Sequence, residues 1–187
     1  MKDIAKTGLI LMAVTVISAG VLAAVNLITK PTIDSYKAEQ AMRAMREVLP
    51  EAKDGVFVPR KKGDFEYYEG YADPDTTQPV GYVFLAAGSG YSSVIETIVG
   101  VDLGGTIEGI KILSQQETPG LGARVTEVKH GDTKPWFQVQ FEGKKALELA
   151  LRADGGDIDA ITGATISSRT VVSSIRKAAE KLLGKRD

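Results

Sequence analysis

The sequence contains no cysteine and only one histidine, His130. Without cysteine the chain cannot form disulfides, hold an iron–sulfur cluster or a thiolate zinc site, or use a cysteine nucleophile. With one histidine we expect neither a histidine-based metal site nor a serine–histidine triad, and we place His130 at the surface. We therefore predict no metal site and no catalytic residue, so any redox chemistry must come from a bound organic cofactor.

An excess of charge of one sign is also missing. The chain has 23 Lys and Arg against 24 Asp and Glu, a formal net charge of -1. No basic patch interleaved with aromatic residues is present, so we do not expect the chain to bind nucleic acid. Its 187 residues, of which 43% are hydrophobic, suffice for one domain with an appendage and a buried core.

A long apolar run is present near the start of the chain. Residues 7–28 include no charged residue and, as a helix, would span about 33 Å, enough to cross a bilayer. The alternative is a cleaved signal peptide, since Ala19, Ala23 and Ala24 are small, but the run exceeds the usual apolar core of about 7 to 15 residues. We predict a single transmembrane helix within residues 1–30. Basic residues flank both ends, so the charge count leaves the orientation open.

Pro31 is expected to end the membrane helix or to begin the next one. Apolar residues at helical spacing follow it, which predicts a connecting helix over residues 31–50. We expect the folded domain to occupy residues 51–187. Its first part, residues 51–79, is polar with an aromatic cluster at 65–71, and we expect short strands there.

The middle of the chain has a sequence pattern that is typical of β-strands. Residues 81–87 predict a strand, and residues 94–101 and 106–113 predict a hairpin around Gly104 and Gly105. Further on, Pro119 and Gly120 fit the centre of a type II turn, and Trp136 is expected to be a packing residue. The predicted fold class is α+β, with an antiparallel sheet and flanking helices.

The last part of the chain predicts an amphipathic helix that ends near Gly184. Its apolar stripe recurs at spacings of three and four: Val171, Val172, Ile175, Ala178, Ala179 and Leu182. Thr165, Ser167 and Ser168 are candidate N-cap residues. The unpaired amides at such a helix start would bind a phosphate, and Gly163 and Ala164 leave room for a bulky group to approach the backbone.

The segment before this helix carries a family resemblance. Thr162-Gly163-Ala164-Thr165, preceded by Asp159 and followed by Ser168, resembles the flavin-attachment motif of the FMN-binding domain in the G-type subunit (RnfG) of the Rnf electron-transport complex. The C-type subunit of the sodium-pumping NADH:quinone oxidoreductase has a similar domain. The resemblance covers most of the chain in order: the amino-terminal span, Gly90 and Tyr91, residues 117–122, Trp136 and residues 154–157. The lack of cysteine and a length below 200 favour the RnfG family.

The resemblance implies a particular cofactor site. FMN would be joined through its phosphate to the hydroxyl of Thr165 by a separate flavin transferase that uses FAD as donor. Thr162 and Ser168 would donate hydrogen bonds to the phosphate, and Asp159 would order the loop. The resemblance places the following residues along the isoalloxazine ring: Glu117, Thr118, Gly120 and Leu121. A phosphodiester at a helix start would gain about 0.3 to 1 kcal/mol if exposed.

The resemblance also implies a function. The chain would be an electron carrier on the extracytoplasmic side of the membrane, working with the other subunits of a cation translocase that couples reduced ferredoxin and NAD to sodium or proton movement. It has no Rossmann fingerprint, so we do not expect it to bind NADH itself.

Three alternatives stay open. The first is a membrane-anchored binding or assembly module without redox function, in which Thr165 is an ordinary N-cap and Glu117 a solvated loop carboxylate. The second is a C-type subunit of a sodium-pumping NADH:quinone oxidoreductase. The third is a stand-alone reductase with the same FMN-binding domain.

Overall fold

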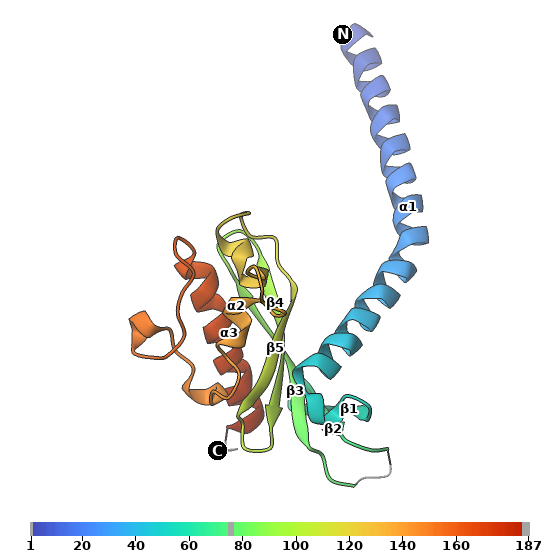
Figure 1. Cartoon of the computed structure of the whole chain (residues 1–187). Coiled ribbons are helices and arrows are strands. Elements are labelled where there is room, and N and C mark those ends of the chain that lie inside the picture. The colour runs from blue at the N-terminus through green and yellow to red at the C-terminus, as the bar shows by residue number, and fades with distance from the viewer. Residues whose placement is uncertain (1, 75–76, 185–187) are drawn as a thin grey trace. The chain divides into compact units, whose positions relative to one another are not determined.

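The computed structural model describes residues 2–74 and 77–184. The chain divides into two compact units, Met1–Gln40 and Ala41–Asp187. Helix α1 (Lys2–Val48) forms the described part of the first unit and continues into the second (Figure 1). Because α1 continues through Pro31, the expected break at this proline is wrong. One proline removes a single backbone hydrogen bond, and the helical residues on both sides outweigh that local cost.

The first unit exposes apolar side chains along its length. Every residue from 3 to 40 is exposed, and the most apolar stretch of the helix has a mean hydropathy of 2.4. The hydroxyl of Thr15 donates to the carbonyl of Leu11 (2.6 Å), and that of Thr29 donates to the carbonyl of Val25 (2.8 Å). These polar groups are therefore satisfied within the helix itself, as an apolar surrounding requires. By length and composition the helix can cross a membrane.

The second unit contains a five-stranded antiparallel sheet in which neighbours in sequence are neighbours in space. Its strands are β1 (Val56–Lys62), β2 (Phe65–Tyr71), β3 (Gly81–Ser89), β4 (Val94–Asp102) and β5 (Ile107–Ser114). Gly105, with a φ of +76°, lies in the turn between β4 and β5. The predicted α+β class, the antiparallel sheet and the hairpin are confirmed.

One face of the sheet is covered by α3 (Thr165–Leu183) and the short α2 (Trp136–Val139) (Figure 1). The predicted apolar stripe of α3 is buried there, for example Val171 and Ile175 against Phe84 and Val99 of the sheet. Short 3-10 turns connect these elements: η2 (Gly122–Thr126), η3 (Ala146–Glu148) and η4 (Arg152–Asp154). The start of α3 is consequently fixed by a large apolar core.

The opposite face of the sheet is covered by the end of α1 and by η1 (Pro50–Ala52). Val48 and Leu49 cross the sheet where each of four neighbouring strands carries a glycine: Gly70, Gly81, Gly100 and Gly109. A side chain at any of these glycines would meet Val48 or Leu49. The last turns of α1 are thus part of the core of the second unit.

Candidate functional site

Helix α3 starts without a side-chain cap. Its N-cap is Ala164, so the prediction that Thr165, Ser167 or Ser168 caps the helix is wrong. Within the part of the chain that the structure describes, the amides of Thr165, Ile166 and Ser167 have no acceptor. These three N–H groups and the positive end of the helix dipole can therefore receive an anion.

The two serines that follow are used inside the protein. The Ser167 hydroxyl donates to Oε2 of Glu117 (2.6 Å). The Ser168 hydroxyl accepts from the amide of Ile161 and donates to the carbonyl of Ala164, both at 3.0 Å. Both serines are buried, so they shape the loops around the helix start.

The next two residues of α3, Arg169 and Thr170, bond to two further segments of the chain. Arg169 forms an ion pair with Asp154 (2.9 Å), and the Thr170 hydroxyl donates to the carbonyl of Ser89 (2.8 Å). Residues 167–170 of α3 therefore each form a bond to a residue that precedes the helix. These bonds fix the position of the first turns of α3 and so the surroundings of Thr165.

Glu117 is the centre of a dense hydrogen-bond network. Its Oε1 accepts from the amides of Ser92 (3.0 Å) and Ser93 (2.9 Å) and from the Ser93 hydroxyl (3.0 Å). Its Oε2 accepts from the amide of Tyr91 (3.1 Å) and from Ser167. Burial opposes the charge, but the hydrogen bonds from Ser167 and from the three amides outweigh it and lower the pKa of Glu117 from 4.5 to about 2. The carboxylate is ionised at neutral pH.

Two glycines pack directly against this carboxylate. A Cβ at Gly122 would lie 2.5 Å from Oγ of Ser167 and 2.7 Å from Oε2 of Glu117. A Cβ at Gly90 would lie 2.7 Å from Oε1 of Glu117. Only glycine fits at either position, because no side chain can approach the carboxylate so closely.

Two turns face each other beside the helix start. The Leu121 amide donates to the carbonyl of Thr118 (3.1 Å) and Gly120 has a φ of +77°, as the type II turn predicted at Pro119 and Gly120 requires. Gly163, also with a φ of +77°, lies in the opposite turn, and a Cβ there would be 3.1 Å from Cδ2 of Leu121. The close approach of the two turns therefore depends on Gly163, whereas Gly120 faces open space and is needed only for its positive φ.

A cavity of about 450 Å³ opens between these segments. Its lining residues are Tyr91, Glu117, Thr118, Leu121, Gly122, Gly163, Ala164, Thr165, Ile166 and Ser167. Three of them expose a large apolar side chain: Tyr91 (74% exposed), Leu121 (45%) and Ile166 (52%). Its volume lies in the range of small-molecule sites. Apolar side chains line one part of the cavity, and the amides at the start of α3, which can receive an anion, line another.

Six of the ten predicted site residues line this cavity: Glu117, Thr118, Leu121, Gly163, Ala164 and Thr165. The other four do not line it: Gly120, Asp159, Thr162 and Ser168. Thr162 is exposed in the turn that precedes α3. Asp159 pairs with Arg152 (2.6 Å), and its amide donates to Gln140 (2.7 Å), so it fastens the loop upstream of the turn.

Four lining residues were missing from the predicted set: Tyr91, Gly122, Ile166 and Ser167. Ile166 had a usable signal, because it is an isoleucine outside the buried stripe of α3. Ser167 could not be found from the sequence, because its role depends on Glu117, which lies 50 residues away.

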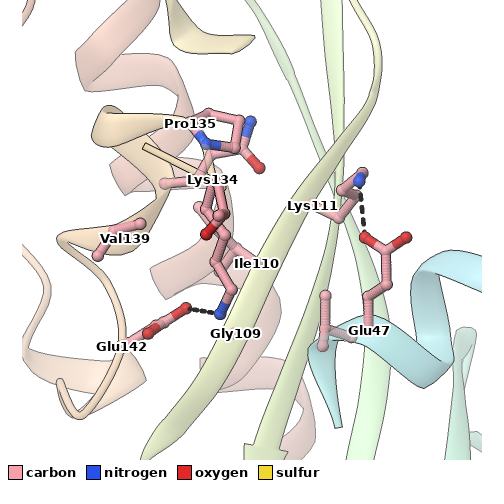
Figure 2. Close-up of a pocket in the computed structure, with 11 residues that line it drawn as sticks. Glu47, Gly109, Ile110, Lys111, Lys134, Pro135, Val139 and Glu142 are labelled. Carbon is pink, nitrogen blue, oxygen red and sulfur yellow. Dashed lines mark hydrogen bonds and ion pairs between the residues drawn. The ribbon is translucent and has the colours of Figure 1, made fainter. Parts of the chain in front are cut away.

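Another cavity lies beside β5. It measures about 100 Å³, and Figure 2 shows an ion pair on either side of it, Lys111 with Glu47 and Lys134 with Glu142, both at 2.6 Å. None of the predicted site residues lines it. The cavity at the start of α3, which six of the predicted site residues line, is the candidate site.

The fold and the site define an FMN-binding protein. The family model described as FMN-binding domain matches residues 90–180, which include every residue that lines the cavity at the start of α3. A solved structure, the C-type subunit of the Na(+)-translocating NADH-quinone reductase from Parabacteroides distasonis, is 26% identical with a TM-score of 0.51. That match covers 66% of this chain and 64% of the other, so this chain spans slightly less than two thirds of that protein.

Residues 1–48 match the family model described as the RnfG N-terminal region. The G-type subunit of the ion-translocating oxidoreductase complex of Methanosarcina acetivorans is 32% identical, over 96% of this chain and 94% of the relative. The G-type subunit of the Na(+)-translocating ferredoxin:NAD(+) oxidoreductase complex of Acetobacterium woodii is 33% identical, over 93% and 89%. The chain belongs to this RnfG family of ion-translocating oxidoreductase complexes. Together with the apolar helix, this makes it a membrane protein.

Proposed function

We propose that this chain carries FMN joined through its phosphate to the hydroxyl of Thr165, and that it relays electrons between other subunits of an ion-translocating ferredoxin:NAD oxidoreductase. The observation that carries the proposal is the position of Thr165. This exposed threonine lines the cavity as the first residue of α3, where three amides are without an acceptor among the described residues. The names of the relatives from M. acetivorans and A. woodii support the electron-transfer role.

The lining residues fit a phosphate-bearing flavin. The free amides of α3 would bind the phosphate oxygens, and the exposed apolar side chains would pack on the ring: Tyr91, Leu121 and Ile166. Thr118 and the turn at Gly120 would border the ring. Thr162 is a further candidate donor to the phosphate, because it is exposed in the turn before Thr165. When bound, FMN supplies the electron-transfer chemistry, and the chain holds and orients it.

The attachment requires a partner enzyme, which we propose to be a flavin transferase that uses FAD. The Thr165 oxygen would form a bond to the FMN phosphorus while the bond between the two phosphates of FAD breaks. AMP leaves, and the hydroxyl proton is released. The covalent bond retains the flavin on the extracytoplasmic side of the membrane, where we propose that the soluble part lies.

Intact-mass measurement tests this proposal. Full-length protein produced with a flavin transferase should gain the mass of one FMN less one water. Thr165→Ala should gain none, whereas Thr133→Ala, which removes an exposed threonine outside the cavity lining, should still be modified. Unmodified wild-type protein from cells in which the transferase modifies another substrate would favour an assembly module without redox function. A stand-alone reductase would instead reduce an acceptor continuously without partner subunits, which we do not expect.

A further inference from the structure

Glu117 is fully occupied by groups of the protein. Its two oxygens accept five hydrogen bonds, four from residues 91–93 and one from Ser167. Gly90 and Gly122 pack against the carboxylate of Glu117 so closely that neither position has room for a side chain. The carboxylate is therefore not free to bond a ligand, although the resemblance placed it along the flavin ring. Through these five hydrogen bonds Glu117 links residues 91–93 to Ser167 in the first turn of α3, and we call this link the Glu117 clasp.

Among the described residues that line the cavity, Glu117 is the only charged one. No lysine, arginine or histidine of the described chain joins it there. Reduction of a flavin by two electrons and one proton leaves one negative charge on its ring. A fixed negative charge nearby disfavours this state, because like charges repel strongly in a partly buried site.

We propose that Glu117 is a positioning residue that fastens residues 91–93 to the first turn of α3 around the cavity, and that its negative charge keeps the reduction potential of the bound FMN low. This inference rests on the proposed function, since it concerns the same site. Its two consequences, the order of the loop and the flavin potential, can be measured separately.

Hydrogen exchange tests the clasp without any flavin. In detergent-solubilised full-length protein the amides of residues 91–93 should be protected. In Glu117→Gln they should exchange about ten-fold faster or more, because hydrogen bonds to a charged acceptor are lost. Amides of β4 serve as the internal reference and should keep their exchange rates. Unchanged exchange at residues 91–93 would overturn the proposal whether or not FMN is bound.

Redox titration with dithionite tests the charge in flavin-loaded protein. Glu117→Gln should shift the midpoint potential upward, whereas Glu117→Asp, which keeps the charge, should stay nearer to wild type. Glu108→Gln removes an exposed carboxylate on β5 outside the cavity lining and should leave the potential unchanged. A loaded Glu117→Gln protein with the wild-type potential would overturn the proposal.

The two proposals fail in different ways. Wild-type protein without flavin contradicts the proposed function, while the exchange experiment still decides whether Glu117 is a clasp. A folded Glu117→Gln protein that exchanges faster and takes up no flavin supports the clasp, because the cavity is then not assembled.

Discussion

At the scale of single residues, the position of Thr165 is determined by the bonds that its neighbours in α3 form. The first turns of α3 are held from several sides by bonds to residues outside the helix: Ser167 to Glu117, Ser168 to Ile161, Arg169 to Asp154 and Thr170 to Ser89. Ala164 contributes by having no side-chain acceptor, which leaves the first amides for a ligand. The Thr165 hydroxyl is therefore held in a fixed position beside amides that have no acceptor among the described residues. It is well placed for modification, because few groups of the protein must lose conformational freedom when the ligand binds.

The acid sensitivity of the fold should depend on Glu117. Its pKa is lowered to about 2 in the folded protein, so its contribution to stability is complete above about 4.5 and is lost as the pH falls toward 2. Because one pKa unit corresponds to about 1.4 kcal/mol, the contribution is roughly 3 kcal/mol at most. The measurement is the free energy of unfolding of full-length protein between pH 5 and pH 2, compared with Glu117→Gln. The difference between the two proteins should shrink as the pH falls, and parallel curves would contradict the assignment.

At the scale of elements, the site is made by turns that bring distant segments together. The sequence predicted the turn at Pro119 and Gly120 and the helix that begins at Thr165, because glycine, proline and helical periodicity are local signals. It did not predict that these two elements meet through Glu117 and Ser167, because that contact depends on tertiary packing. The assignment of N-cap residues failed because the helix begins directly after Ala164. The Ser167 hydroxyl bonds the distant Glu117, which the sequence could not show, whereas the Ser168 hydroxyl bonds Ala164 within the same turn.

The turn at Gly163 should be sensitive to a single methyl group. Gly163→Ala places a side chain at a φ of +77° and 3.1 Å from Leu121, which should cost about 1 to 2 kcal/mol and displace the loop that holds Thr165. Gly131→Ala is the matched control, because Gly131 has a φ of +92° with open space around it. Thermal unfolding should show a loss of stability in both variants, and intact mass should show reduced flavin attachment only in Gly163→Ala. Equal attachment in the two variants would count against a role of this turn in the site.

The crossing of α1 over the sheet predicts a second glycine effect. Gly100→Ala would push its side chain into the backbone of Val48 and should destabilise the protein by about 3 kcal/mol or more, as overpacking of a filled core does. Gly104→Ala, in the turn between β4 and β5, meets its nearest atom at 3.4 Å and should change stability little. Denaturant titration of both variants measures this difference. Similar midpoints would show that the end of α1 is held more loosely than in the structure.

For the whole molecule, the sequence yielded the α+β class, the apolar helix and the antiparallel hairpin from patterns that are local in the chain. It did not show that α1 runs without a break to Val48 and enters the core, because the local rule for proline pointed to a boundary at Pro31. The glycines that admit Val48 and Leu49 are far apart in sequence and become a group only when the strands pair.

The proposed orientation can be tested cleanly because the chain has no cysteine. A cysteine in place of the exposed Glu108 should react with a membrane-impermeant maleimide in intact spheroplasts if the soluble part is extracytoplasmic. Lysed spheroplasts provide the control for reactivity. Labelling that appears only after lysis would place the soluble part on the cytoplasmic side.

The central claim is that the Thr165 oxygen carries FMN. Trypsin should release residues 153–169 as one peptide, since Arg152 and Arg169 bound a stretch without Lys or Arg. Fragmentation of this peptide from protein matured with the flavin transferase is the most direct measurement. We predict an added mass of FMN less water on fragments that contain Thr165 and on none that end before it. The same added mass on Thr162, Ser167 or Ser168, or an unmodified peptide, would contradict the claim.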